Sequence, residues 1–324
     1  MKKLLSGGGI FVAATTFAYW SPAPVYAPVQ PLQEVPVKVL FVGDLMLDRN
    51  VARSLQEEGA WALFATSTRS LFAAADLRVA NLEGAVTANP SIARRNNKIL
   101  RFTFEPAITE TVLTLLNLNI ISLANNHALD FGADGYTETR SRVEALGVGV
   151  FGHPYNATGT ISNTVTVQGK RFCFVGYHSL FAPSTATITE EIKIIRPDCW
   201  RVVVFAHWGE EYKTTAAVAQ RDQGHTFIDA GADLVIGAHP HVVEEVEVYK
   251  GKAIFYSLGN FMFDQNFSWE TTHGLAVRAD FYADKTTFIL TPLTLEQQHL
   301  SVATGLDRER ILGLAGMVAE FSLP

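Results

Sequence analysis

Polar side chains of the kinds that bind metal ions follow several apolar runs of this sequence, each where a β-strand is expected to end. The most unusual case is "GAHPH", in which only Pro240 separates His239 from His241. In open α/β sheets, ligands bind beyond the carboxyl ends of the strands, so we expect these strand-end side chains to converge on one rim. The full set is Asp44, Glu83, Asn126 with His127, His207, and the pair His239 and His241.

The residue types in this set indicate what it could hold. Imidazoles, carboxylates and an amide oxygen suit divalent ions such as Zn, Mn, Fe or Mg, and no cysteine lies in these loops to form a thiolate site. A lone strand-end Asp or Asn is usually a turn former, but the joint pattern favours a metal site. We therefore expect one or two divalent ions. Two ions about 3.5–4 Å apart would clamp a phosphoryl oxygen and activate a bridging water.

Alternating strand and helix patterns must position these side chains. Apolar runs predict strands over 37–47, 76–84, 119–127, 200–207, 233–239 and 252–260, and a 3.6-residue periodicity predicts helices over 51–75, 105–118, 132–147 and 217–232. Hairpins are expected at 161–177 and 273–297, because alternating, β-branched segments flank short turns there. Strands that alternate with helices, followed by hairpins, indicate an α/β layered sandwich.

Composition and charge exclude some partners. The 324 residues are 48% hydrophobic, with 26 Lys and Arg against 32 Asp and Glu, and the formal net charge is −6. This balance, without a Lys/Arg-rich block, argues against a nucleic-acid partner. Cys173 and Cys199 are too few for a disulfide scaffold and lack the C-x-x-C spacing of a zinc knuckle. We expect both to be unpaired core residues, with a single disulfide as the alternative.

The N-terminal segment has the layout of a secretory signal. Lys2 and Lys3 precede an apolar stretch from Leu4 to Trp20, and small residues lead to Ala27. An uncleaved membrane anchor is the alternative, because about 17 to 20 apolar residues can just span a bilayer. We assign 1–27 to a signal peptide or anchor and 28–36 to a Pro-rich linker. The rest of the chain is expected outside the cytoplasm, secreted or anchored to the membrane through this segment.

Five stretches together resemble a known family. They are "GDLML" at 43–47, "ANLEG" at 80–84, "NNHALDFG" at 125–132, "HWGEEY" at 207–212 and "GAHPHVVEEVEVYKGKAIFYSLGNFMFD" at 237–264. Their order is similar to that of bacterial capsule-synthesis proteins of the CapA type, which are linked to poly-γ-glutamate capsules and belong to the calcineurin-like metallophosphoesterase superfamily. The resemblance implies a four-layer sandwich of two mixed β-sheets flanked by helices over 37–300, and an extracytoplasmic location. Residues 301–324 remain as a C-terminal tail that we expect to be helical.

The resemblance also implies roles for single residues. The superfamily pattern is D-x-H, G-D-x-x-D, G-N-H-[DE], an isolated His and G-H-x-H. His127 matches the histidine that stabilises charge on phosphate or protonates the leaving group. The positions that match metal ligands are Asp44, Asn126, His207, His239 and His241.

Two positions depart from the superfamily pattern. Met46 stands where D-x-H has its histidine, and a thioether is a poor ligand for hard or borderline ions. "ANLEG" replaces G-D-x-x-D, so the bridging carboxylate is either replaced by Asn81 or supplied by Glu83. Two further motifs each leave two interpretations open. Glu210 in "HWGEEY" is a catalytic acid or base beside the metal, or else a carboxylate on the surface. Asn260 in "SLGNF" lines the site, or else caps its strand.

Three hypotheses of function follow. The first is a metal-dependent hydrolase of the phosphoesterase type, with the strand-end set as ligands and His127 and Glu210 as catalytic residues. The second is a non-catalytic, membrane-tethered component of capsule polymer assembly or export, in which the metal is structural or grips a polyanionic chain. The third is metal-dependent hydrolysis or transfer at an amide of a glutamate polymer. The implied partners are the capsule polymer and membrane-bound synthesis or export proteins.

Overall fold

Two β-sheets that pack face to face, with helices around them, form the architecture. The computed structural model describes residues 7–16, 34–96 and 98–324. Residues 7–16 and 34–36 carry no helix or strand. The other residues of the expected signal or anchor (1–27) and linker (28–36) lie outside the described ranges. No helix within these ranges has the length and hydropathy needed to cross a bilayer.

The larger sheet has nine strands in the part of the chain that the structure describes. Seven run in the order β16 (His299–Val302), β15 (Thr286–Glu296), β14 (His273–Phe281), β1 (Val37–Leu45), β2 (Leu77–Leu82), β5 (Ile120–Ser122) and β6 (Gly149–Phe151), while β13 (Asn260–Met262) pairs with β1 and β17 (Glu320–Leu323) with β15. β1 is parallel to β2 and β13 and antiparallel to β14. The pairs β2–β5 and β5–β6 are parallel, and β14–β15 is antiparallel. The sheet is therefore mixed.

The smaller sheet has a parallel centre and antiparallel edges. Its order is β11 (Val246–Tyr249), β12 (Lys252–Phe255), β10 (Leu234–Ala238), β9 (Arg201–His207), β8 (Lys170–His178) and β7 (Ser162–Val167). The pairs β12–β10, β10–β9 and β9–β8 are parallel. A separate ribbon joins β3 (Ala85–Val86) to β4 (Thr103–Phe104).

Helices follow most of the parallel strands. They are α1 (Arg49–Glu58), α2 (Ala60–Leu63), α3 (Thr66–Ala73), α4 (Pro106–Leu115), α5 (Gly132–Ala145), α6 (Ala186–Ile195), α7 (Val218–Ala230) and α8 (Gly305–Ala315), with 3₁₀ turns η1 (Arg196–Asp198) and η2 (Glu270–Thr272). The segment 51–75, predicted as one helical run, forms three helices, because Gly59 has φ +82° and ends α1. Pro106 occupies the first turn of α4, as the sequence predicted.

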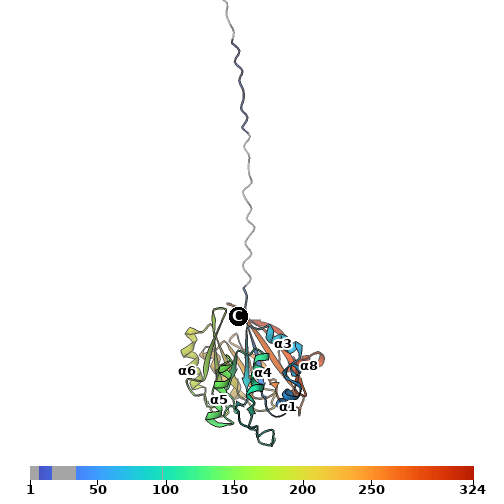
Figure 1. Cartoon of the computed structure of the whole chain (residues 1–324). Coiled ribbons are helices and arrows are strands. Elements are labelled where there is room, and N and C mark those ends of the chain that lie inside the picture. Colours follow the sequence, from blue (N-terminus) through green and yellow to red (C-terminus); the bar gives the residue numbers. More distant parts are fainter. Residues whose placement is uncertain (1–6, 17–33, 97) are drawn as a thin grey trace, which may run out of the picture. The chain divides into compact units, whose positions relative to one another are not determined.

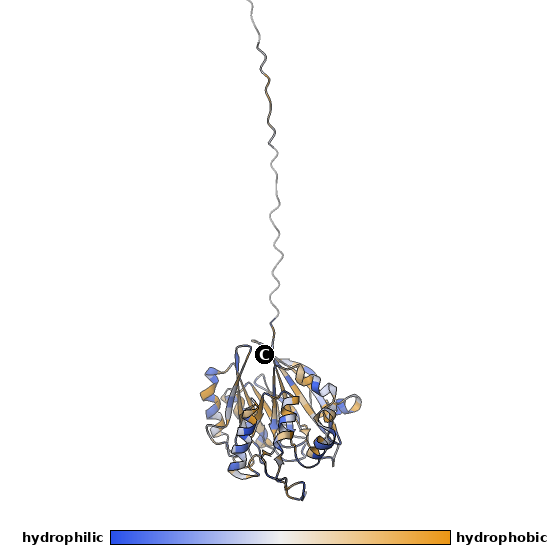
Figure 2. Ribbon diagram, in the orientation of Figure 1, coloured by the Kyte–Doolittle hydropathy of each residue, from blue (hydrophilic) through white to orange (hydrophobic). Residues whose placement is uncertain are grey.

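Three apolar layers hold these elements together. Between the sheets, Phe41 of β1 belongs to the same apolar cluster as Phe174 and Phe205 of the smaller sheet, and all three are buried. Successive strand residues point to opposite faces, so Val42 packs under α1 to α5, and Val204 packs under α6 and α7. The result is a helix–sheet–sheet–helix sandwich, which confirms the predicted fold class. Figure 1 shows α6 on one side of the strands and α1 and α3 on the other, and Figure 2 shows the hydrophobic colours concentrated in the strands.

The C-terminal segment 301–324 belongs to the same unit as the rest of the sandwich, which extends from Val35 to Pro324. It contains α8, but it ends in β17, which pairs with Thr286–Ile289 of β15. Ile311 and Ala315 of α8 are buried in the layer between the sheets. The segment thus contributes a helix, a strand and part of the core.

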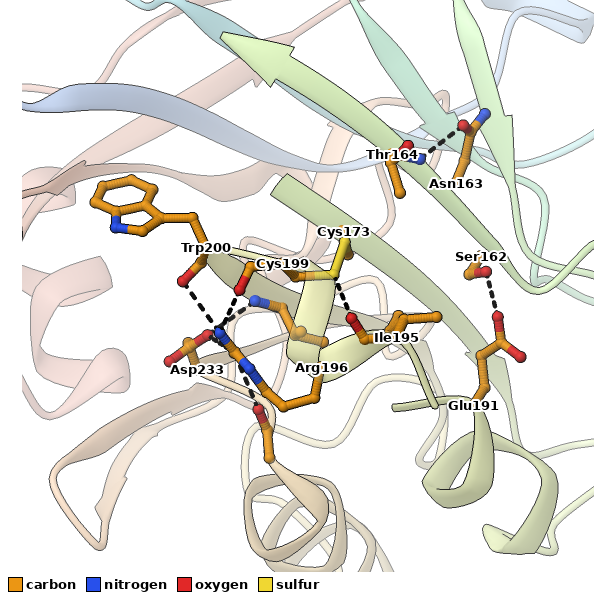
Figure 3. The surroundings of a disulfide bond; sticks show 12 residues. Ser162, Asn163, Thr164, Cys173, Glu191, Ile195, Arg196, Cys199, Trp200 and Asp233 are labelled. Atoms are coloured by element: carbon orange, nitrogen blue, oxygen red, sulfur yellow. Dashed lines mark hydrogen bonds and ion pairs between the residues drawn. A yellow bond between two sulfur atoms is a disulfide. The ribbon is translucent and has the colours of Figure 1, made fainter. Parts of the chain in front are cut away.

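A disulfide joins Cys173 of β8 to Cys199, with the Cα atoms 5.9 Å apart (Figure 3). The expectation of two unpaired core cysteines is therefore wrong, and the alternative of a single disulfide is correct. Arg196 stabilises the same turn: its guanidinium donates to the Cys199 carbonyl at 2.6 Å and pairs with Asp233. The bond thereby attaches the end of α6 and η1 to the smaller sheet.

Removing this disulfide should lower the free energy of unfolding. The cystine closes a loop with a sequence separation of 26, and loss of that constraint on the unfolded chain costs about 3 kcal/mol. The double variant Cys173→Ala/Cys199→Ala should therefore unfold at lower urea concentration than the wild type. Dithiothreitol should move the wild-type midpoint towards that of the variant and leave the variant unchanged. Equal midpoints of oxidised wild type and variant would contradict this role.

Candidate metal centre

The carboxyl ends of the central strands of both sheets meet at one place. Asp44 of β1 is in register with Asn81 of β2 and with Asn260 of β13. On the smaller sheet, His207 of β9 is in register with Ala238, the last residue of β10. Gly43 allows the close approach of β1 to the loop before β13, because a Cβ atom on it would lie 1.9 Å from the Gly259 carbonyl oxygen. The strand-end residues predicted from the sequence are therefore neighbours.

The loop "HPH" after β10 holds two histidines in an uncommon backbone conformation. His239 has φ +96° and His241 has φ +59°, both in the region that non-glycine residues seldom adopt. Such backbone strain persists only where the surroundings enforce it. Here the backbone N–H of His239 donates to Asp44 Oδ2 at 3.2 Å, and the Pro240 carbonyl accepts from the Tyr212 N–H at 2.8 Å. The loop is thus held with both imidazoles facing the end of β1.

Asp44, Glu83 and His241 form the most buried part of the site. His241 Nδ1 lies 3.3 Å from Asp44 Oδ2, and His241 Nε2 lies 3.7 Å from Glu83 Oε1. Asn260 Oδ1 is also within 3.0 Å of His241 Nδ1. Ligand atoms of Asp44, Glu83 and His241 all lie within 4.8 Å of one another. This spacing suits coordination of a single cation.

Two buried ligand atoms have no hydrogen-bond partner among the described residues. They are Glu83 Oε1 and His239 Nδ1. A buried polar atom left without a partner costs about 1–3 kcal/mol, so each needs an explanation. Bound divalent cations would satisfy each of them, since carboxylate oxygens and imidazole nitrogens are among the ordinary ligands of such ions. The donor set therefore fits a metal ion.

Asn81 occupies the centre of the site. Its Nδ2 donates to Asp44 Oδ1 at 2.8 Å and lies 3.3 Å from His207 Nδ1. Its Oδ1 accepts from Asn125 Nδ2 at 3.0 Å, and Asn125 also donates to the Leu82 carbonyl at 2.9 Å. Asn125 was not predicted from the sequence, although it directly precedes a predicted ligand.

His207 and Asn126 lie together at the smaller-sheet side of the site. His207 Nε2 is 2.8 Å from Asn126 Oδ1, and the His207 ring centroid is 4.7 Å from that of His239. Among the described histidines and carboxylates, His207 belongs to neither of the three-residue ligand groups. Behind His207 lies His178, which the sequence analysis did not single out; it is fully buried, and its ring centroid is 5.5 Å from that of His207.

Met46 lies outside the ligand groups. It is fully buried in the layer under the helices, and its Sδ accepts a hydrogen bond from the Asp48 N–H at 3.0 Å. The structure therefore places a core thioether at the position where the resembled D-x-H pattern has a metal-binding imidazole.

His127 is oriented by a carboxylate that was not predicted from the sequence. His127 Nδ1 lies 2.8 Å from Asp130 Oδ2, three residues later in the chain. The ring also packs against Phe102, with centroids 4.3 Å apart and the ring planes tilted by 35°. The i, i+3 spacing of His127 and Asp130 was the available signal.

Of the two adjacent glutamates after β9, Glu211 lies with the histidines and Glu210 does not. Glu211, His239 and His241 form a second group whose ligand atoms lie within 4.8 Å of one another. Glu210 has a side chain that is 74% exposed and sits 3.8 Å from Lys213 Nζ. The neighbouring glutamate is therefore the one with the geometry of a ligand.

Burial and neighbouring charges set the protonation states. Burial and the carboxylate of Asp44 raise the pKa of Glu83 well above its ordinary value. Burial would also raise the pKa of Asp44, but hydrogen bonds and charge contacts led by His241 lower it. Burial and the other imidazoles lower the pKa of His207 and bring the pKa of His239 to about 3. At neutral pH, Asp44 is thus ionised and these two imidazoles are neutral, the forms that bind metals.

A hollow of about 600 Å³ opens onto this cluster. His127, Glu211 and His241 line its floor together with Phe102 and Phe263. Of the residues in the two ligand groups, Glu211 and His241 therefore border the hollow.

Sequence comparison gives matches over most of the chain. The family model described as "Bacterial capsule synthesis protein PGA_cap" matches residues 38–265. "PGA biosynthesis protein CapA" of Bacillus subtilis (strain 168) is 34% identical over 253 residues, which cover 73% of this chain and 65% of that protein. "Capsule biosynthesis protein CapA" of Bacillus anthracis is 29% identical over 310 residues, covering 88% and 74%. The chain thus spans just under two thirds of the length of the B. subtilis relative.

Structural comparison gives more distant likenesses. A putative 5'-nucleotidase from Staphylococcus aureus aligns at 13% identity and a TM-score of 0.48, over 85% of this chain and 57% of that chain. A hypothetical protein from Thermus thermophilus aligns at 18% identity and a TM-score of 0.47, over 82% and 97%. At this level of similarity, neither alignment carries a functional argument.

Acid should destabilise the metal-free protein through His239. Its folded pKa of about 3 lies below the ordinary 6.5, so the unfolded chain binds a proton first as the pH falls. The stability that neutral His239 confers is therefore complete above pH 6.5 and is lost as the pH falls towards 3. Below about pH 6, the free energy of unfolding of the wild type should fall by roughly 1.4 kcal/mol per pH unit relative to that of His239→Gln.

Urea denaturation in EDTA at several pH values measures this difference. The control is His299→Gln, because the His299 side chain is 44% exposed and lies outside the site. A plot of its free energy of unfolding against pH should run parallel to that of the wild type. A parallel curve for His239→Gln as well would show that His239 is not held neutral by burial.

Proposed function

Because the chain belongs to the bacterial capsule synthesis protein family PGA_cap, we propose that it is a metal-dependent hydrolase of the phosphoesterase type acting in capsule synthesis. Family membership confirms the resemblance seen in the sequence motifs. The observation that carries the hydrolytic part of the proposal is the pair of unpartnered buried atoms, Glu83 Oε1 and His239 Nδ1, among carboxylates and imidazoles.

The two ligand groups assign residues to the ions. Asp44, Glu83 and His241 would hold one divalent ion, and Glu211 and His239, with His241 shared, would hold a second. Zn, Mn, Fe and Mg all remain compatible with this mixture of oxygen and nitrogen ligands. When bound, such ions supply Lewis acidity towards a phosphoryl oxygen and lower the pKa of a coordinated water.

His127 is the proposed general acid. Its Nδ1 is occupied by the Asp130 carboxylate at 2.8 Å, which fixes the ring and leaves Nε2 to carry the proton for the leaving group. Phe102 packs against the ring and shields it from solvent on that face. Glu211 takes the place beside the metal that the sequence analysis gave to Glu210.

Asn81 and Met46 favour a second candidate function. The Asn81 amide donates to Asp44 Oδ1, where a bridging carboxylate would instead add negative charge for a second ion. The buried Met46 removes a further imidazole from the ligand set. A single ion that grips an anionic polymer without cleaving it fits these two residues, and the protein would then be a non-catalytic component of capsule assembly or export.

We further propose that the protein works outside the cytoplasm, with the capsule polymer and membrane-bound synthesis or export proteins as partners. The Cys173–Cys199 disulfide supports this location, because the cytosol keeps most thiols reduced. The signal-like pattern at 1–27 is consistent with it.

Replacing His127 tests the hydrolase directly. Loss of a general acid typically costs about 10²–10⁴-fold in rate, so His127→Ala should lower kcat for bis-p-nitrophenyl phosphate by about that factor. Metal content should stay at the wild-type level, because His127 belongs to neither ligand group. Asp130→Asn should give a smaller loss, and His299→Ala should match the wild type. Unchanged turnover in His127→Ala would remove it from the mechanism. Bound metal with no turnover of any phosphate ester would favour the non-catalytic function.

A further inference from the structure

Glu211 differs from the other residues of the two ligand groups because it is exposed. His239 and His241, which share its group, are both buried. A long, exposed side chain loses rotamer freedom when it is held in one place, so its position beside the histidines depends on the backbone that carries it. The path of the turn after β9, residues 208–212, therefore decides whether the second ligand group can bind an ion.

Both ends of this turn are fixed by backbone hydrogen bonds to the loop after β10 and to the end of that strand. The Trp208 N–H donates to the carbonyl of the last residue of β10 at 3.2 Å, and the Tyr212 N–H donates to the Pro240 carbonyl at 2.8 Å. These two bonds leave the middle of the turn, at Gly209, to be placed by side-chain packing.

The side-chain amide of Gln220 packs against Gly209. A Cβ atom on Gly209 would lie 2.7 Å from Gln220 Nε2, so the amide lies directly against the backbone there. Gln220 belongs to the first turn of α7 and is buried. Its Oε1 accepts from the Ala217 N–H at 2.7 Å, as in a helix N-terminal capping box. This bond fixes the orientation of the amide, and Nε2 is the end that needs an acceptor.

Glu244 supplies that acceptor. Gln220 Nε2 donates to Glu244 Oε2 at 2.8 Å, and the Glu244 side chain is buried. The Glu244 N–H donates to the Ser257 carbonyl at 3.2 Å, which holds the residue to the segment between β12 and β13. Burial raises the pKa of Glu244 to about 8, so the carboxyl is neutral at pH 7. Glu244 belongs to neither ligand group of the described chain.

We infer that Glu244 is a positioning residue for the second ion. Through Gln220 it holds the turn after β9, and that turn keeps Glu211 beside His239. The inference rests on the proposed function, because it concerns the second ion of the same site. Neither Glu244 nor Gln220 touches the ion or the substrate in this role. Loss of either should release Glu211 towards solvent and leave the other ligand group intact.

Isothermal titration calorimetry of the metal-free full chain with Mn²⁺ tests this role, and the wild type should bind two equivalents. Glu244→Leu should bind the first equivalent like the wild type and the second about 10–100-fold more weakly, the usual effect of removing a residue that orients a metal ligand. Glu244→Gln should restore the second equivalent, because glutamine is neutral and keeps an acceptor oxygen for Gln220.

The link through Gln220 has its own variants. Gln220→Leu should weaken the second equivalent as Glu244→Leu does. The double variant Glu244→Leu/Gln220→Leu should lose no more than either single variant, because residues that act as one unit are not additive. The retained first equivalent reports that each variant is folded. If Glu244→Leu fails to fold, Gln220→Leu decides by the same measurement.

Glu247→Leu is the matched control. Glu247 also binds α7, but its ion pairs there go to Arg221 and His225, so this variant should bind two equivalents like the wild type. Loss of its second equivalent would assign the effect to a general loosening of α7 and overturn the inference. An unchanged second equivalent in Glu244→Leu would overturn it as well, and so would loss of both equivalents in that variant when folded.

The outcome for the wild type separates this inference from the proposed function. A single equivalent in the wild type would overturn the inference, because there would be no second ion to position, whereas turnover of a phosphate ester by that protein would still support a hydrolase. Two equivalents without turnover of any phosphate ester would contradict the hydrolase and leave the role of Glu244 intact.

Discussion

The burial of the Asp44 carboxylate at the end of β1 is the constraint on which the site depends. A buried charge is tolerated only when hydrogen bonds and opposite charges compensate its desolvation. Asn81, the backbone of His239 and the ring of His241 each contact this carboxylate. They come from β2 and the loop after β10, so satisfying one carboxylate draws the ends of both sheets together. The positive φ values of the "HPH" loop follow from the same requirement.

Much of the fold and of the inner site could be predicted because the relevant signals are local. Each central strand is an apolar run that ends in a polar residue, and the ends of parallel strands share one edge of a sheet. Asp44, Glu83, His239 and His241 were found in this way, and the structure brings their ligand atoms together. Asn81 and Asn260 also contact this cluster.

What the sequence did not predict depends on geometry beyond the strand ends. The turn after β9 uses Gly209 at φ +89° and Tyr212 at φ +67°, and this path decides that Glu211 faces the histidines. No periodicity encodes that choice. The pairing of Cys173 with Cys199 likewise depends on how η1 packs on β8. The grouping of Arg49, Arg53, Arg94 and Arg95 around the hollow was not predicted, because two come from α1 and two from a loop some forty residues later.

The architecture suits a protein that presents metal ions to an anionic substrate. The larger sheet supplies Asp44 and Glu83, and the loops after β9 and β10 of the smaller sheet supply Glu211, His239 and His241. Arg49, Arg53, Arg94 and Arg95 line the hollow beside them. Asn81 and Met46 mark where this chain departs from the metallophosphoesterase motif pattern that its sequence resembles. Whether one ion or two is held there decides between the proposed hydrolase and a non-catalytic polymer-binding role.

The most direct test of the central claim is elemental analysis of the purified full chain by inductively coupled plasma mass spectrometry. The wild type, loaded with Mn or Zn and passed through a desalting column, should retain one or two equivalents of divalent metal. The variant His241→Ala should retain much less, because His241 belongs to both ligand groups. Equal, near-zero metal in both proteins would contradict a metal centre at this site.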